Sequence, residues 1–205
     1  IATDSLGNLY VIMNSGKLLM IDHASPRNAK FVGPQTFDGM PTGLCVDEQD
    51  QYLYVTRHRA GTAYGSARIV QLDLQSSGRA LQIVAEDTSV EYCWKAITRG
   101  VDLWTASVDE LSIFPMRRGS IRVMSGGISG QSTEILSQPL DGISYVTGIV
   151  FDADGNLYFA ERAGNIYKVD FDPLSGDFVR NNGRPVLAKI SGPIDPLFID
   201  DSIET

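Results

Sequence analysis

One short pattern occurs twice, 148 residues apart, and constrains the fold more than any other feature of this sequence. Residues 4–11 read DSLGNLYV, and residues 152–159 read DADGNLYF. Between them, residues 47–55 (DEQDQYLYV) and 98–105 (TRGVDLWT) carry more divergent copies. The Leu-aromatic pairs of the four copies lie 44, 50 and 54 residues apart. A self-similar spacing of this size is typical of a repeat architecture.

Each copy is followed by a second shared segment. Residues 16–22 (GKLLMID), 67–73 (ARIVQLD) and 164–170 (GNIYKVD) match closely, and 109–115 (DELSIFP) matches without the final Asp. In the Asp-x-x-Gly-Asn stretch, Gly and Asn tolerate a positive φ and Asp bonds its own backbone, so the stretch predicts a tight turn. The apolar residues on both sides of this turn have the composition of strands.

A fourth, more variable run completes each unit, at 80–84, 133–136 and 185–190. Four antiparallel strands in ~40–50 residues make one blade of a β-propeller. A β-sandwich does not repeat a signature at this period, and the lack of amphipathic segments of ~12 residues between the strands disfavours an α/β repeat. The sequence therefore predicts an all-β propeller of four blades in one domain (1–205). The expected blades are 1–40, 41–92, 93–144 and 145–194, and a further blade starts at 195–205.

Two closures of the propeller are compatible with this repeat. The C-terminal strand either completes the first blade and closes a four-bladed ring, or the chain is an arc of a larger propeller, such as one with six blades. We favour the arc, since both ends of the sequence fall inside blades.

Composition and charge restrict the class of partner. The net charge is −8, whereas a nucleic-acid binder normally presents a basic patch, so we expect no nucleic-acid partner. No apolar run approaches the ~18 residues of a membrane span. Residues 1–4 lack the basic and apolar regions of a signal peptide, and the localisation stays open because a targeting segment can precede Ile1. Cys45 and Cys93 match no zinc or redox spacing, which predicts two buried thiols, with a disulfide between neighbouring blades as the alternative.

Residues 145–170 (YVTGIVFDADGNLYFAERAGNIYKVD) resemble the NHL-repeat and gluconolactonase-like (SMP-type) superfamily of six-bladed propellers. The resemblance covers the two-part signature of all four units and is strongest in the first and fourth. In the gluconolactonase branch it implies a divalent cation such as Ca²⁺ at the channel mouth, held by acidic and Asn side chains that precede a Gly. Here Thr42 precedes Gly43 and Thr147 precedes Gly148. A neutral hydroxyl is a poor ligand for such a cation, so we expect no metal or other cofactor.

Aligning the repeats gives a candidate binding ring at the channel mouth. One slot of the repeat is occupied by Thr42, Cys93, Thr147 and Asp195. Because propeller repeats are related by rotation about one axis, these side chains should line one end of the channel. The alternative for Asp195 is a solvent-exposed side chain that caps a turn before Pro196 and binds no ligand. A nucleophilic role for Cys93 lacks the base that activation requires.

Two loops also differ from their counterparts. Residues 57–66 lengthen one connection of the second blade by about seven residues and carry the candidate contact residues Arg57, His58, Arg59 and Tyr64. Long loops on a rigid scaffold often contact partners, although solvated charge is the simpler interpretation. The Gly/Ser-rich residues 126–132 predict a flexible excursion.

The leading functional hypothesis is a non-catalytic propeller module that presents a face for a protein or small-molecule ligand. The alternative is a metal-dependent hydrolase of the gluconolactonase or strictosidine-synthase-like kind, with its site residues substituted or outside this chain. A purely structural element of a larger assembly is the third possibility. Propellers host many functions, so the fold does not decide among them.

Overall fold

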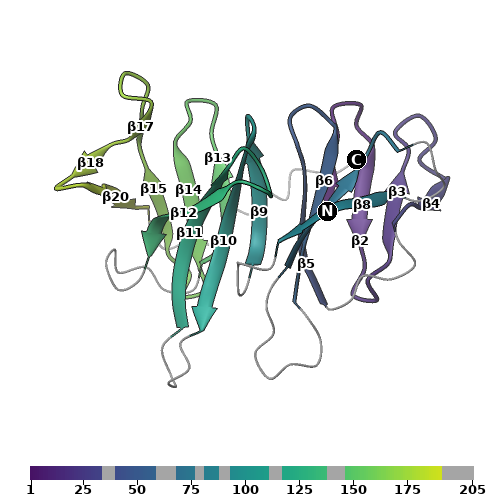
Figure 1. Ribbon diagram of the computed structural model, residues 1–205, viewed down its shortest axis with the longest axis horizontal. Helices are drawn as coiled ribbons and strands as arrows, with labels where there is room; N and C mark the ends of the chain where they lie inside the picture. Colours follow the sequence, from purple (N-terminus) through teal and green to yellow (C-terminus); the bar gives the residue numbers. More distant parts are fainter. Residues whose placement is uncertain are drawn as a thin grey trace, which may run out of the picture.

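The computed structural model describes residues 1–33, 40–58, 68–76, 81–87, 93–110, 117–137 and 146–190. These residues form strands, turns and links with no helix, and the strands make four separate four-stranded antiparallel sheets (Figure 1). The prediction of an all-β propeller is confirmed. Each sheet is one blade, and its strands run in chain order from the first strand to the fourth.

Blade 1 contains β1 (Ala2–Thr3), β2 (Leu9–Ile12), β3 (Leu18–Ile21) and β4 (Ala29–Phe31). Blade 2 contains β5 (Met40–Val46), β6 (Tyr52–His58), β7 (Arg68–Asp73) and β8 (Gln82–Asp87). Blade 3 contains β9 (Cys93–Arg99), β10 (Asp102–Glu110), β11 (Arg117–Ser125) and β12 (Gln131–Ser137). Blade 4 contains β13 (Val146–Phe151), β14 (Leu157–Glu161), β15 (Ile166–Val169) and β20 (Leu187–Lys189).

Blade 4 carries an insertion between its third and fourth strands. Two short hairpins lie there: β16 (Phe171–Asp172) with β17 (Asp177–Phe178), and β18 (Arg180–Asn181) with β19 (Arg184–Pro185). In Figure 1 these hairpins project at the left of the molecule.

The repeated leucines occupy one position of the blade. Leu9, Leu53, Leu103 and Leu157 all lie in the second strand and pair with an apolar residue of the third strand. Three of them are completely buried, and Leu9 is half-buried. The equivalence that the repeat predicts is confirmed. Leu9 differs because its sheet is the first of the row and no described sheet packs on that side.

The Asp-x-x-Gly-Asn turn is held by side-chain hydrogen bonds. Gly155 has a φ of +87°, as expected for a glycine turn. Asn156 does not have a positive φ; instead its backbone N and Nδ2 donate to the two carboxylate oxygens of Asp152, both at 2.9 Å. Its Oδ1 accepts from the Phe171 backbone N at 2.9 Å, which ties the turn to the chain just after the third strand. Asn8 makes the same three kinds of bond in blade 1.

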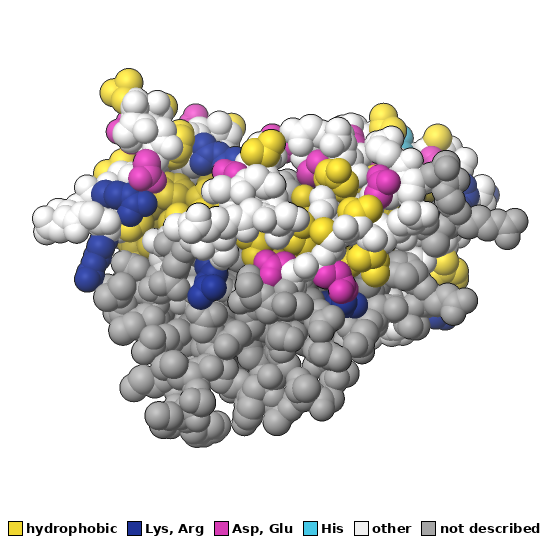
Figure 2. All heavy atoms as spheres, in the orientation of Figure 1, with side chains coloured by type: hydrophobic (Ala, Val, Ile, Leu, Met, Phe, Trp, Pro, Cys, Tyr) yellow, Lys and Arg dark blue, Asp and Glu magenta, His cyan; other side chains and the backbone are white. Residues whose placement is uncertain are grey.

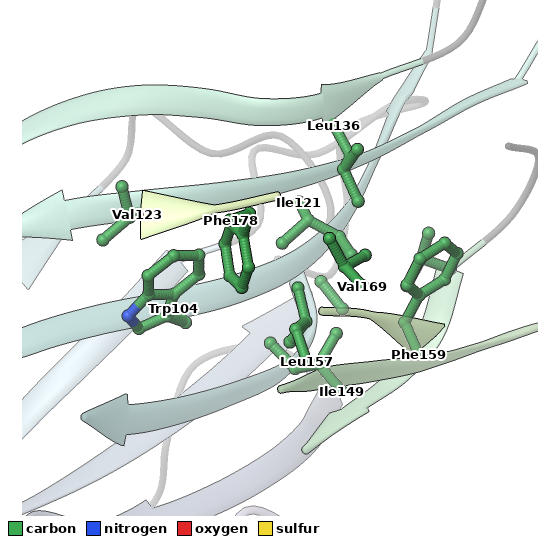
Figure 3. Close-up of a cluster of buried hydrophobic side chains, with 11 residues drawn as sticks. Trp104, Ile121, Val123, Leu136, Ile149, Leu157, Phe159, Val169 and Phe178 are labelled. Carbon is green, nitrogen blue, oxygen red and sulfur yellow. The ribbon is translucent and has the colours of Figure 1, made fainter. Parts of the chain in front are cut away.

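Three hydrophobic clusters lie between successive sheets. One joins blades 1 and 2, a second joins blades 2 and 3, and the third joins blades 3 and 4. Figure 3 shows the third cluster, in which Trp104 and Ile121 of blade 3 meet Ile149, Leu157 and Phe159 of blade 4. Packing of each sheet on its neighbour removes the apolar face of both from water, which a single blade cannot do alone.

The first strands of neighbouring blades run parallel, and this gives the molecule two distinct ends. The Thr42 hydroxyl donates to the Cys93 carbonyl at 2.6 Å near the start of β5 and β9, and the Thr98 hydroxyl donates to the Val46 carbonyl at 3.3 Å near their ends. We call the end where these strands start the loop end, and the end where Gly155 turns the chain the turn end. Figure 1 shows the loop end at the bottom and the turn end at the top.

The four described blades form a row, with blade 1 at the right and blade 4 at the left of Figure 1. Whether the whole chain is an arc or closes into a ring stays a prediction. The expected start of a further blade, at 195–205, lies outside the described residues.

Residues 126–132, predicted as an excursion, form a tight turn and the start of a strand. Gly126 and Gly127 make a turn with positive φ, and β12 begins at Gln131. Ile128 is 7% exposed and packs in the cluster between blades 2 and 3. This aliphatic side chain anchors the turn in the cluster between the blades, which the Gly and Ser content of the segment did not indicate.

Candidate binding faces at the two ends

Thr42 lies at the loop end and connects two blades. Its hydroxyl donates to the Cys93 carbonyl at 2.6 Å and shares a hydrogen bond with the Thr56 hydroxyl at 2.9 Å. A Cβ on the adjacent Gly43 would lie 3.0 Å from the Trp94 carbonyl, so β5 and β9 approach closely here. The threonine in this slot therefore holds the blades together.

Cys93 is completely buried, and its thiol donates to the Lys95 carbonyl at 3.4 Å. Burial raises the pKa of Cys93 far above its usual range and raises the pKa of Cys45 to about 12. Both thiols are free and lie in the cluster between blades 2 and 3. The prediction of two buried thiols holds, and no disulfide joins them. A thiol held neutral in this way is a poor nucleophile.

The strand registers correct the repeat alignment by one residue. In β5 and β13, a bulge leaves Thr42 and Thr147 without a direct partner in the second strand. In β9 the corresponding bulged residue is Trp94, because Lys95 pairs with Ala106 and Cys93 pairs with Ser107. Trp94 therefore shares the slot of the two threonines.

The error has a physical origin in the turn after the first strand. Cys93 and Thr147 both precede their repeated leucine by ten residues. The turn between Thr98 and Leu103 is one residue shorter than the turn between Phe151 and Leu157, so equal spacing along the chain does not give equal height in the sheet.

Thr147 is exposed at the loop end, and its hydroxyl donates to the Ala160 carbonyl at 3.3 Å. The structure brings Thr42, Cys93 and Thr147 to the same end of the blades, but Cys93 is completely buried in the cluster between blades 2 and 3 and does not line an open ring. Asp195 lies outside the described residues. A binding role for this ring stays a prediction.

Of the four loop candidates, Arg57 is the one whose side chain the structure describes. Its side chain is 6% exposed and makes an ion pair with Glu86 of the edge strand β8 at 2.5 Å. A guanidinium buried in this way supports the blade, which differs from the expected exposed contact. His58 ends β6, but its side chain is outside the description, as are Arg59 and Tyr64.

Arg99 of blade 3 contacts blade 4 at the turn end. Its guanidinium carbon lies 4.2 Å from the ring centroid of Phe171 and 4.8 Å from that of Phe151, which indicates cation–π contact with both rings. Its Nη1 donates to the Gly155 carbonyl at 3.4 Å. A Cβ on Gly155 would lie 2.5 Å from the Arg99 Nη2, so a side chain here would displace the guanidinium from its present position, in addition to the strain of the positive φ.

Clefts open at the turn end between the blades. A cavity of about 210 Å³ between blades 2 and 3 is lined by Tyr54, Gln71 and the turn that carries Ile128. A cavity of about 560 Å³ lies along the first strands, between Glu48, Arg99 and Asp154. Figure 2 shows acidic, basic and hydrophobic side chains interspersed over the described part of this face. The sequence analysis missed these clefts because each is built by residues of two blades.

The described residues contain no group of three His, Cys, Asp or Glu side chains placed to hold a metal ion. Within the same ranges, no helix has the length and apolar character needed to cross a bilayer.

Comparison with known proteins identifies the fold. No protein-family model and no curated protein sequence matches the chain. A candidate 6-phosphogluconolactonase from Bacteroides uniformis superposes with a TM-score of 0.57 at 13% identity, over 90% of this chain and 53% of that one. A chain of the mitotic checkpoint complex gives 0.57 at 12% identity, over 89% and 53%. The WD40 propeller domain of Doa1 gives 0.50 at 14% identity, over 88% and 66%.

The chain spans about half the length of the first of these structures. At such identities the likeness concerns the fold and leaves the activity open. Together with the four meander sheets and the three clusters between them, it shows that the chain is a β-propeller.

Proposed function

We propose that this chain is a non-catalytic propeller module, of the NHL-repeat type that its sequence resembles, which presents a face for a partner. The observation that carries the proposal is the use of the repeated slot at the loop end. Where the resemblance to gluconolactonases implies metal ligands, Thr42 bonds to a neighbouring blade and Thr147 bonds within its own sheet. Hydroxyls that make these hydrogen bonds stabilise the blades and supply no anionic ligand for a hard cation.

A protein partner is the first choice of ligand. One similar propeller was solved within the mitotic checkpoint complex, and this chain shares its fold. Rigid blades position loops at the loop end, where Thr147 is exposed and Met40 is 52% exposed. Exposed apolar and hydroxyl side chains on a rigid scaffold suit a protein contact.

The proposal is tested against its enzymatic rival in two assays. The chain should give no hydrolysis of glucono-δ-lactone above the spontaneous rate, with or without added Ca²⁺ or Zn²⁺. Calorimetric titration with each ion should show no micromolar site. Turnover that depends on added metal and is lost on Asp195→Ala would reverse the conclusion and favour a hydrolase.

The position of the face is tested separately, once a partner is available. Thr147→Ala and Met40→Ala should weaken binding more than Asp22→Ala, Asp73→Ala or Asp170→Ala, which change the turn end. The opposite order would move the face to the turn end.

A further inference from the structure

The insertion in blade 4 builds a cleft against blade 3. Seventeen residues separate the end of β15 at Val169 from the start of β20 at Leu187. The first hairpin of this insertion places Phe178 edge-on to Trp104 of blade 3, with ring centroids 5.7 Å apart, and Phe171 edge-on to Phe178 at 6.2 Å. The hairpin therefore reaches from one blade to the next at the turn end.

The resulting cleft has a volume of about 250 Å³. Its lining consists of Arg99, Asp102 and Trp104 from blade 3 and Phe171, Gly176, Asp177 and Phe178 from the inserted hairpin. Sites for small molecules usually enclose roughly 300–1,000 Å³. A cleft below that range, with aromatic walls, suits one anchoring residue of a larger partner better than a free metabolite.

Trp104 supplies a hydrogen-bond donor that no described residue uses. The residue is 8% exposed, and its buried indole Nε1 has no hydrogen-bond partner within the described ranges. In Figure 3 this nitrogen points away from Phe178 and from the rest of the hydrophobic cluster. A buried N–H normally has an acceptor, so an unused one beside a cleft indicates that a ligand supplies it.

Asp102 supplies an acceptor in the same cleft. Its Oδ1 accepts from the Gly126 backbone N at 2.9 Å, and its Oδ2 has no hydrogen-bond partner among the described residues. Asp102 pairs across the hairpin with Arg99, so a positive and a negative side chain lie next to each other. The other carboxylate, on Asp177, accepts from Arg180 Nε at 3.0 Å. The charges of the cleft are thus nearly balanced, so a ligand of either charge would meet no excess of opposite charge there.

We infer that this cleft binds a neutral residue of a partner peptide through one amide. The amide carbonyl accepts from the Trp104 Nε1, the amide N–H donates to the Asp102 Oδ2, and the apolar side chain lies against Phe171 and Phe178. An amide is a neutral group that offers an acceptor and a donor on two separate atoms, as two separate partners in the cleft require, whereas a hydroxyl offers both on one atom. The site lies at the turn end and does not depend on the face proposed at the loop end.

The test uses three small probes with the same aromatic body: N-acetylphenylalaninamide, N-acetylphenylalanine and phenethylammonium. They are titrated into the ¹⁵N-labelled chain while the indole N–H resonance of Trp104 is followed. The neutral amide should shift this resonance and bind at least tenfold more tightly than the other two. Equal or tighter binding of the carboxylate or the ammonium would overturn the ligand class. No shift with any probe would overturn the site.

Two variants separate the donor from the acceptor. Trp104→Phe keeps an aromatic ring and removes the N–H, and Asp102→Asn keeps the bond to Gly126 while the second oxygen becomes a donor. Each should weaken the neutral amide at least tenfold, measured from the backbone resonances of Gly126 and Gly176. Tyr167→Phe also removes one polar atom from an aromatic residue beside the same cluster, and it should leave the affinity unchanged. Unchanged affinity in both test variants would refute the inference, and it would leave the loop-end proposal standing.

Discussion

Replacing Leu157 by Ala tests whether neighbouring blades stabilise each other through the repeated leucine. Leu157 is completely buried in the cluster that blades 3 and 4 share. The change removes three carbon atoms, which is worth ~2.4 kcal/mol at about 0.8 kcal/mol for each buried methylene. Because two sheets form the walls, the cavity cannot collapse fully, and its residual volume raises the expected loss to ~3–4 kcal/mol, within the usual range for such sites.

Leu9→Ala is the matched control, since Leu9 has the same place in the second strand but is half-buried. Its expected cost is ~1–2 kcal/mol, because part of the side chain is already in water. Urea denaturation of both variants, compared at equal m-values, measures the difference. A cost for Leu157→Ala equal to or below that for Leu9→Ala would refute the assignment of the leucine to an interface between blades.

Three further results are expected. Gly155→Ala should lower the free energy of unfolding by ~1–2 kcal/mol more than Gly164→Ala does. Both glycines have a φ near +88°, but only at Gly155 does the new methyl group displace the stacked Arg99. Equal urea midpoints would show that the Arg99 contact does not stabilise the fold. Asn156→Ala should destabilise the chain by ~1–3 kcal/mol through loss of the bond to the chain just after the third strand, and a neutral effect would show that the turn holds without it. The free energy of unfolding should fall between about pH 9 and about pH 12, because the Cys45 thiol loses its proton near pH 9 in the unfolded chain, while burial raises its pKa in the folded chain to about 12. Cys45→Ala should reduce this dependence on pH, measured as urea midpoints across that range. An unchanged dependence would exclude the thiol as its source.

The candidate site was only partly predictable. The loop-end position of Thr42 and Thr147 follows from the repeat, because rotation places equivalent residues at one height. Their bonding does not follow: the Thr42 hydroxyl reaches a carbonyl of the next blade, 51 residues away. Arg57 was expected to be exposed in a loop, yet its side chain is buried and reaches across β7 to Glu86 on the edge strand β8, a partner that is in place only after the chain has turned back twice.

The sequence alone determined the number of strands in a blade, the place of the leucines and the glycine turns. Each of these depends on interactions within about 50 residues, namely the alternation of apolar residues and the backbone freedom of Gly155, and both are written in the local order of residues. The tertiary structure decided which residue of blade 3 is equivalent to Thr42 and Thr147. The length of the turn between the first two strands sets their register, and the shorter turn of blade 3 makes Trp94 the equivalent residue instead of Cys93. It also decided where clefts form: Trp104 and Phe178 lie 74 residues apart in sequence, and they meet because one blade packs on the next.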